Sequence, residues 1–589
     1  MKKTVLCVSA ALTFFIFLSE PLHSQIPTPN AGLTTVGVIP VPVWTPAGAT
    51  SASFDLFSFN PLTRILYQAD WRNHGALVID TVTNTLQAII KPPACTQTTC
   101  PSGVLVIPDL QKLVLTSRQT TLWIYDLKDP SAAPVTMTGL PAGQDELDYD
   151  PIHQRIYVAN TTAPFFEIGV DLVGPTANTV VATIPLPGAP EQPRYNPVDG
   201  FIYQTVPSTG VVVIDPEAAG TGAIVKTIPA SDCGPQGNDI DPVTNIALLA
   251  CTGGTTLKGA EVMSLADGKV LAFWPNTQVT DVLYFNRNNR RWYTGSGLST
   301  YNGGNCPSTN TGTVFPVLGV YAAQPVGSAD NPIFVGAQCS GRSGRIAGVD
   351  PIGNNVYVPM AQYPADPSSN ATGQTGILVF NDAAPAQPTP ARSQAILGTN
   401  GTVTFTQQGR AMNVFASLQG LADAATRLVV TSTAGNEVVS CSESSGKAVC
   451  TGTLVGDPMI GGLVLLGNNA KTLSRGKIAS SPALLVTGMS FDKPKVAAGG
   501  SETATISGSN LTAQTYFDIR YRIPGSAAEN VALNWQTGVS AGHALPAASA
   551  VGTWTITGVR AHEDQADHTG TYVPVSATMT IVPRNPFAF

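Results

Sequence analysis

Apolar and polar residues alternate in short runs along this chain, and one such pattern recurs. Residues 145–160 read DELDYDPIHQRIYVAN, which is an alternating run, an Asp-Pro pair and a second run ending in Ile156-Tyr157-Val158. Asp followed by Pro favours a type I turn, because the Asp side chain bonds nearby backbone and Pro fixes φ. Two such runs around a turn predict a β-hairpin.

The same frame occurs seven times in the first two thirds of the chain. The positions aligned with Pro151 are Pro61, Pro108, Pro151, Pro197, Pro242, Arg287 and Pro351. A large residue follows six positions later, as Tyr67, Val114, Tyr157, Tyr203, Leu248, Tyr293 and Tyr357. The frames are separated by 47, 43, 46, 45, 45 and 64 residues. A period near 45 residues with four strands per unit is typical of β-propeller blades.

We therefore predict an all-β protein: a seven-bladed β-propeller over residues 34–382, followed by two small β-sandwich (Ig-like) domains. The run from Thr34 to Val43 is expected to supply a strand that closes the ring against the last blade. The longest interval between frames contains Cys306 and Cys339. We interpret this interval as an insertion closed by a disulfide, and not as a missing blade.

The frame also resembles a known repeat family. The segments IYVAN, VYVPM, ALVID and VVVID are similar to the YVTN-type β-propeller repeats of bacterial exported and surface-layer-like proteins. The resemblance covers residues 34 to 382, and the Asp/Asn-Pro pair is altered in the second and sixth copies. It implies a propeller fold and an exported location, and it does not imply one activity.

The repeat ends before the C-terminal third. Residues 383–393 are rich in Pro and Ala and predict a semi-rigid linker. Beyond it, turn signals every 8 to 12 residues predict one β-sandwich over 394–488 and an Ig-like sandwich over 489–584. The last unit resembles the bacterial Ig-like domains that end many exported proteins.

The N-terminus indicates export. Lys2 and Lys3 precede an apolar stretch from Val5 to Leu18, so residues 1–24 are predicted to be a signal peptide. No later apolar run reaches the length of a membrane span, which predicts a secreted, periplasmic or surface-located protein without a transmembrane segment. Charged residues make up 12% of the chain and the net charge is −7. A mildly acidic chain without a basic run argues against nucleic acid as a partner.

The cysteines support this location. Cys7 falls in the predicted signal peptide, which leaves an even number in near pairs. The predicted disulfides join Cys95 to Cys100, Cys233 to Cys251, Cys306 to Cys339 and Cys441 to Cys450. Sequence alone does not fix this connectivity, and other pairings stay open. The absence of a CxxC motif argues against a redox or zinc role.

Candidate ligand-binding residues lie six positions before each frame position, where the innermost strands begin. They are Asp55, Ser102, Asp145, Glu191, Gln236, Asp281 and Arg345, with Glu146, Gln192 and Asn238 as a second tier. In a propeller, Asp55, Asp145, Glu191 and Asp281 would surround one mouth of the axial channel. Four carboxylates there suit a hard cation such as Ca²⁺, or a lactonase- or lyase-like reaction. Alternatively, they bond free backbone N–H groups of the connecting loops, or face water.

Aromatic residues form a second candidate set. Trp71, His74, Phe165 and Phe166 fall where loops between second and third strands should reach the same face. Exposed aromatic residues there would form a binding platform. Otherwise they cap the hydrophobic core of a blade.

No recognisable catalytic set emerges from the sequence. The few histidines are scattered, which argues against a triad hydrolase and a histidine-built metal centre. We therefore predict a binding or scaffold protein that presents a ligand-binding face to an unidentified extracellular protein, saccharide or small molecule. One alternative is a cation-dependent lactonase- or lyase-like enzyme at the channel mouth. The other is a surface-layer-like structural protein.

Overall fold

The structure is a computed structural model of the whole chain. It describes residues 31–42, 54–96, 100–218, 220–230, 232–253, 258–299, 315–324, 332–341, 344–363, 374–386, 392–408, 411–480, 485–493, 495–498, 502–509, 511, 515–543, 551–562 and 572–583. The predicted signal peptide and Cys306 lie outside this part of the chain. In the described residues nearly all regular structure is strand, with one short 3₁₀ helix, η1 (Gly220–Ala223), and no helix able to cross a membrane.

The recurring frame forms a hairpin, as predicted. In the third copy, β10 (Gln144–Asp150) pairs antiparallel with β11 (Arg155–Asn160). The Asp150 carboxylate accepts the backbone N–H of Ile152 at 2.8 Å, which fixes the turn. Gln154 closes the turn in the left-handed region, at φ +52°.

Among the described residues, seven antiparallel sheets have four strands each. In chain order they are β2 (Phe54–Asn60), β3 (Ile65–Asp70), β4 (Gly75–Asp80) and β5 (Thr85–Ile90); β6 (Val104–Ile107), β7 (Lys112–Thr116), β8 (Leu122–Asp126) and β9 (Val135–Met137); β10, β11, β12 (Phe166–Asp171) and β13 (Thr179–Pro185); β14 (Pro193–Asn196), β15 (Phe201–Val206), β16 (Gly210–Ile214) and β17 (Ile224–Ile228); β18 (Pro235–Asp241), β19 (Ile246–Cys251), β20 (Gly259–Ser264) and β21 (Val270–Trp274); β22 (Leu283–Asn286), β23 (Arg291–Ser299), β24 (Phe315–Ala322) and β25 (Ile333–Cys339); and β26 (Gly348–Asp350), β27 (Asn355–Tyr363), β28 (Gln374–Asn381) and β1 (Thr34–Pro40).

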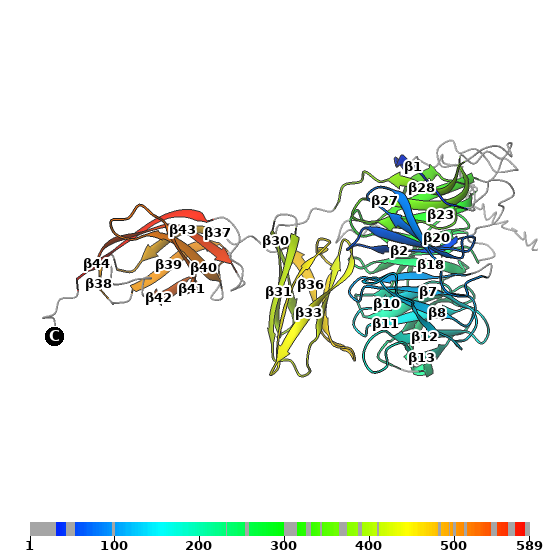
Figure 1. Cartoon of the computed structure of the whole chain (residues 1–589), viewed down its shortest axis with the longest axis horizontal. Coiled ribbons are helices and arrows are strands. Elements are labelled where there is room, and N and C mark those ends of the chain that lie inside the picture. Colours follow the sequence, from blue (N-terminus) through cyan, green and yellow to red (C-terminus); the bar gives the residue numbers. More distant parts are fainter. Residues whose placement is uncertain are drawn as a thin grey trace, which may run out of the picture.

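These sheets build a β-propeller (Figure 1). Each innermost strand contacts the next one along the chain, and β26 contacts β2 to complete the ring. The predicted closing strand is confirmed, because β1 pairs antiparallel with β28 and so becomes the outer strand of the last sheet. The innermost strands therefore surround an axial channel.

Tyrosines of the frame fill the space between neighbouring sheets. Tyr157, Tyr203, Tyr293 and Tyr357 are among the largest fully buried side chains. Some also bond across sheets: the Tyr357 hydroxyl donates to Asn84 of the first sheet at 2.7 Å. No four-stranded sheet can bury both of its faces alone, so this packing requires the closed ring.

In several copies, the Asp or Asn before the frame position also joins neighbouring sheets. Asn196 contacts Asn245 of the next sheet at 2.9 Å. Asp241 forms a buried ion pair with Arg290. Asp350 of the last sheet pairs with Arg64 of the first at 2.5 Å. One side chain therefore fixes its own turn and the contact to the next sheet.

Three disulfides have the predicted pairing: Cys95–Cys100, Cys233–Cys251 and Cys441–Cys450. The first closes a loop of the propeller, the second joins the segment before β18 to the end of β19, and the third links the neighbouring strands that contain Cys441 and Cys450. The Cys306–Cys339 pair stays a prediction because Cys306 is outside the described residues.

The unit after the linker differs from the predicted sandwich. Its eight strands close into a barrel in the order β29, β30, β31, β34, β33, β32, β35, β36. They are β29 (Arg392–Leu397), β30 (Gly401–Gln408), β31 (Ala411–Gln419), β32 (Arg427–Ser432), β33 (Gly435–Ser444), β34 (Lys447–Leu454), β35 (Leu463–Gly467) and β36 (Thr472–Ser480). The closure arises because β33 pairs with β32 at one end and β34 at the other, while β29 pairs with β36.

The C-terminal unit has two sheets around its own core, which includes Phe517 and Trp554. One contains β37 (Leu485–Phe491), β39 (Glu502–Ser509) and β42 (Ser540–His543). The other contains β38 (Lys495–Ala497), β44 (Val573–Val582), β43 (Gly552–His562), β40 (Tyr516–Arg522) and β41 (Asn530–Thr537). The barrel lies between this unit and the propeller (Figure 1).

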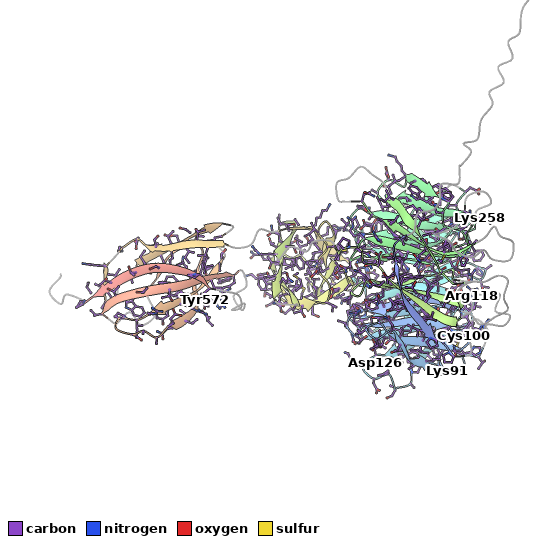
Figure 2. All side chains as sticks on the ribbon, turned by 90° about the horizontal axis from the view of Figure 1, so that it is seen from above. Lys91, Cys100, Arg118, Asp126, Lys258 and Tyr572 are labelled. Carbon is purple, nitrogen blue, oxygen red and sulfur yellow. A yellow bond between two sulfur atoms is a disulfide. The ribbon has the colours of Figure 1, made fainter. Side chains whose placement is uncertain are left out.

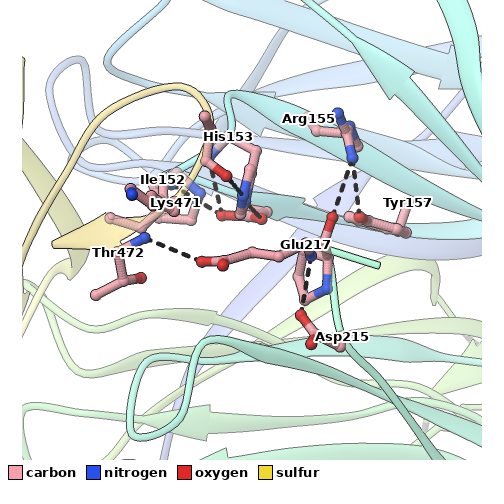
Figure 3. A network of polar contacts seen from close by, with 12 residues as sticks. Ile152, His153, Arg155, Tyr157, Asp215, Glu217, Lys471 and Thr472 are labelled. Carbon is pink, nitrogen blue, oxygen red and sulfur yellow. Dashed lines mark hydrogen bonds and ion pairs between the residues drawn. The ribbon is translucent and has the colours of Figure 1, made fainter. Parts of the chain in front are cut away.

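The barrel packs against one face of the propeller, where the frame turns emerge. Ile152 of the propeller shares a hydrophobic cluster with Val429 and Leu465 of the barrel. The Thr472 backbone N–H donates to the Glu217 carboxylate at 3.1 Å (Figure 3). These contacts join the two units directly, besides the linker.

His153 takes part in this contact through both of its ring nitrogens. Nδ1 faces the Asp150 carboxylate, and Nε2 lies 3.0 Å from the Ala470 carbonyl of the barrel (Figure 3). Both partners are acceptors, so only the protonated imidazolium satisfies both bonds. Burial alone would lower the pKa of His153, but the charge and hydrogen bonds of Asp150 and Ala470 raise it overall.

We expect the docking contact of His153 to be pH-dependent. A raised pKa in the folded state adds stability below the unfolded value of about 6.5, and this stability is lost as pH rises through the folded pKa. His153→Gln should therefore lower the melting temperature by a few degrees more at pH 6 than at pH 9. A loss of 1 kcal/mol in stability corresponds to about 2–4 °C. An equal loss at both pH values would mean that His153 is neutral in the folded protein.

Candidate functional site

Two of the carboxylates predicted at the channel mouth, Asp55 and Asp145, lie on irregular strand starts. In β10, pairing with β11 shifts between Gln144 and Leu147, so Asp145 and Glu146 together face one residue of the partner strand. The same shift places Asp55 in β2 on a bulge. A bulge bends the strand and redirects its side chains, which is why these acids are not confined to the strict alternation of a regular strand.

The structure brings the four predicted acids into one electrostatic cluster. Burial raises the pKa of Asp55 well above its ordinary value, and the charges of Asp145 and Asp281 raise it further. Glu191 is affected by the same two neighbours. We call this cluster the acidic mouth; it comprises Asp55, Asp145, Glu146, Glu191 and Asp281 with Arg118 and Arg345.

Two arginines partly neutralise the acidic mouth. Arg118 pairs with Asp145 at 2.7 Å, and Arg345 pairs with Asp281 at 3.3 Å. The arginine side chains are about 40% exposed, whereas Asp145 is only 3% exposed. Arg118 lies on the face of the propeller turned away from the barrel (Figure 2). The acidic mouth therefore faces outward, at the end opposite the docked barrel.

If all five acids were ionised, their charge would exceed that of the two arginines in a mostly buried site, so burial and mutual repulsion favour the protonated carboxyl groups. Burial and the charges of Asp145 and Asp281 raise the pKa of Glu191 to about 8. Burial, followed by the charges of Asp55 and Glu191, raises the pKa of Glu146 well above its ordinary value. One oxygen each of Asp145 and Glu146 is buried without a hydrogen-bond partner. A cation that entered the mouth would bond these oxygens and favour the ionised carboxylates.

The acids do not form a compact ligand set. Within the described part of the chain, the one trio of potential metal ligands with atoms inside 4.8 Å is Cys233, Cys251 and Glu261, and its cysteines form a disulfide. Ca²⁺ binds oxygens at about 2.3–2.6 Å, so a bare ion would have to draw the mouth carboxylates closer. The arrangement fits a larger cationic group better than a preformed calcium site.

Other members of the predicted set have structural partners. The Ser102 hydroxyl donates to the Gln144 carbonyl at 2.8 Å, and the Gln236 carbonyl accepts a bond from Thr205. In the second tier, the Gln192 side chain accepts the Asn238 backbone N–H at 2.8 Å. Of these contacts, only that of Gln192 is the kind described by the alternative interpretation, in which the side chain accepts a backbone N–H between sheets.

The four residues of the predicted aromatic platform have different surroundings in the structure. The half-buried rings of Phe165 and Phe166 pack against two different hydrophobic clusters, as core caps do. His74 lies in the β3–β4 turn in the left-handed region, at φ +50°. Trp71 belongs to the acidic mouth, because the Arg118 guanidinium lies 5.4 Å from the centre of its ring.

The sequence analysis missed the residues of the opposite mouth. They lie three positions before the frame and include Asp148, Arg194, Asp239 and Tyr284. Asp148 accepts the Tyr195 N–H at 2.6 Å, and Asp239 accepts the Phe285 N–H at 2.7 Å, so each ties its sheet to the next. Polar side chains recur three positions before the frame in several copies, and this pattern in the sequence could have predicted the second polar set.

A cavity of about 340 Å³ lies at this opposite mouth. Its walls are the innermost strands, and the barrel residues 434–438 form the remaining side. Arg287 donates to Asn436 of the barrel at 2.8 Å across this boundary. The barrel therefore covers one end of the axial channel, while the acidic mouth is at the other end.

Comparisons with known proteins identify no family. No family model matches the chain, and no curated protein matches it. Solved structures that resemble it include a chain in the crystal structure of the mitotic checkpoint complex, with 13% identity and a TM-score of 0.44, covering 65% of this chain and 99% of that one. Hydrazine synthase of Kuenenia stuttgartiensis has 13% identity and a TM-score of 0.39, covering 58% and 98%. With TM-scores this low, neither similarity bears on function.

Proposed function

We propose that this protein is an exported seven-bladed β-propeller that binds a cationic ligand at the acidic mouth. The observation that carries the proposal is the buried oxygens of Asp145 and Glu146, which have no partner inside a cluster of neighbouring acids that raise one another's pKa. Unpaired buried carboxylate oxygens are costly, and a cationic ligand would remove that cost.

The remaining parts of the chain fit a presenting role. The seven four-stranded sheets would be the seven blades, and the two-sheet C-terminal unit would be the Ig-like domain. The barrel covers the opposite mouth, so a ligand would enter from the acidic side. Disulfides persist in oxidising compartments, which supports export to the periplasm, surface or medium.

We expect cations to stabilise the native protein. A ligand that binds only the folded state raises the melting temperature. At a concentration of 100 times its Kd, it adds about 2.7 kcal/mol to the free energy of unfolding. Melting curves should be recorded with CaCl₂, spermidine and agmatine, each against NaCl of equal ionic strength. The shift should be larger at pH 8.5 than at pH 6, because Glu191, with a pKa of about 8, must lose its proton to attract a cation.

Variants locate the effect. Glu146→Gln with Glu191→Gln should remove the cation-induced shift. Asp267→Asn is the matched control, since it removes one carboxylate charge from an exposed pair with Lys269 in a loop of the fifth sheet. If no cation shifts the wild-type melting temperature, the acidic mouth binds none and a surface-layer-like structural role is the better interpretation.

One observation favours a second function. A carboxyl group with a pKa of about 8 is suited to act as a general acid or base near neutral pH, and Glu191 is such a group. A cation-dependent lactonase- or lyase-like enzyme would use it on a substrate held in the mouth. Product formation from a lactone or uronide panel, lost in Glu191→Gln, would establish this alternative; binding without turnover would exclude it.

A further inference from the structure

The side chain of Arg118 is held at the acidic mouth in the way that proteins hold a guanidinium ligand. The ring of Trp71 lies 5.4 Å from its guanidinium carbon on one side. The Asp145 carboxylate accepts a hydrogen bond from it at 2.7 Å. An aromatic face combined with a carboxylate is the arrangement that recognises organic cations.

The electrostatic surroundings reach further than this one pair. The charge of Asp145 is the main cause that raises the pKa of Arg118, and Asp55 and Glu191 contribute as well. The second oxygen of Asp145 is buried without a partner. The site therefore offers acceptors beyond those that Arg118 uses, and a planar guanidinium with five N–H donors is the group that exploits several acceptors at once.

Arg118 is held less firmly than its surroundings. It lies between β7 and β8, and its side chain is 42% exposed, whereas Asp145 is 3% exposed. Because the Arg118 side chain can turn into solvent, where water replaces its hydrogen bonds, a competing cation can take its place on the buried carboxylate. The carboxylate that remains is buried and fixed in place by the strand bulge.

We propose that the acidic mouth recognises a guanidinium group, and that Arg118 occupies its place in the free protein. The ligand group would stack on Trp71 and bond both oxygens of Asp145, while Asp55 and Glu191 supply negative charge. This inference rests on the proposed cation-binding function and names its ligand class. The group belongs either to a small molecule such as agmatine or to an arginine side chain of a peptide.

Removal of the internal competitor gives the decisive measurement. Binding of agmatine to the full-length protein should be measured by titration calorimetry at pH 8.5, with wild type and Arg118→Ala compared. We expect Arg118→Ala to bind agmatine about five- to tenfold more tightly, because the intramolecular pair no longer competes. Trp71→Leu should weaken binding about threefold or more through loss of the aromatic face.

Arg345→Ala is the matched control. It removes the same charge from the same cluster, but Arg345 pairs with Asp281 and is not held at Trp71. It should therefore strengthen binding of spermidine and agmatine alike, whereas Arg118→Ala should favour agmatine over spermidine. A peptide with one arginine, compared with the same peptide carrying lysine, shows whether a side chain of a protein partner also fits.

The outcomes separate the two proposals. Binding of spermidine or Ca²⁺ with no preference for guanidinium, and equal effects of Arg118→Ala and Arg345→Ala, would overturn the guanidinium assignment and leave cation binding standing. No binding of any cation would overturn both. A gain in agmatine affinity that is specific to Arg118→Ala and lost in Trp71→Leu supports the assignment.

Discussion

Asp241→Ala should destabilise the propeller by about 3–5 kcal/mol, the usual loss when one partner of a buried ion pair is removed. The Arg290 guanidinium would remain with 5% of its side chain exposed and without its carboxylate. The substitution also removes the acceptor for the Val243 N–H at 3.0 Å and for the Thr244 hydroxyl at 2.6 Å. The urea midpoint of the propeller transition, followed by tryptophan fluorescence, measures the loss.

Two controls test this cause. Asp267→Ala removes a carboxylate from an exposed pair with Lys269 and should leave the midpoint unchanged. Adding Arg290→Met to Asp241→Ala should recover part of the stability, because it removes the unpaired buried charge. If the double variant is less stable than Asp241→Ala, Arg290 contributes through bonds other than the ion pair.

Arg427→Met should loosen the docking of the barrel by about 2–4 kcal/mol. The guanidinium donates to the carbonyls of Pro151 and Ile152 at 3.3 and 2.9 Å, and it also contacts Asn469. Methionine keeps the apolar stem but leaves these buried carbonyls without a donor, at about 1–3 kcal/mol each. Hydrogen exchange of peptides covering β32 and the turn after β10 should accelerate about 30-fold or more.

Arg475→Met is the comparison for this experiment. Arg475 also donates from the barrel to a propeller carbonyl, that of Val198 at 3.2 Å, but it is exposed. Water can replace its bond, so exchange should change little. Unchanged exchange in Arg427→Met would mean that the cluster around Ile152, Val429 and Leu465 holds the barrel without this arginine.

The propeller could be predicted from the sequence because its signal is repeated. One Asp-Pro turn is weak, but seven copies at a period near 45 residues indicate seven similar units. The side chain at the position before Pro also has two roles in some units, as in Asp241, which bonds its own turn and the next sheet. When one residue stabilises both a local turn and a contact between sheets, its position in the repeat helps to predict the fold.

The site was only partly predictable for a physical reason. The offset of six residues found Asp55, Asp145, Glu191 and Asp281, since each lies at or just before the start of an innermost strand. Glu146 stood only in the second tier, because its contribution depends on a bulge that strict alternation does not reveal. Arg118 was not predicted at all, since it reaches the mouth from a loop outside the repeated pattern.

The barrel was predicted as a sandwich because both folds have short alternating strands and frequent turns. What separates them is whether β29 and β36 pair, and that contact joins the first and last strands of the unit. Its docking on the propeller was not predicted either. Ile152 and His153 read as ordinary turn residues in the sequence, and only the tertiary arrangement gives them partners such as Ala470.

The pairing of β1 with β28 sets an order for assembly. Thr34 is synthesised early, whereas its partner Asn381 follows more than 300 residues later. The last sheet therefore cannot be completed until almost the whole propeller has been made, and the first strand must wait without its neighbour. Contacts so distant along the chain slow folding and leave an edge open to wrong partners. A chaperone that shields this segment would be most useful during that interval.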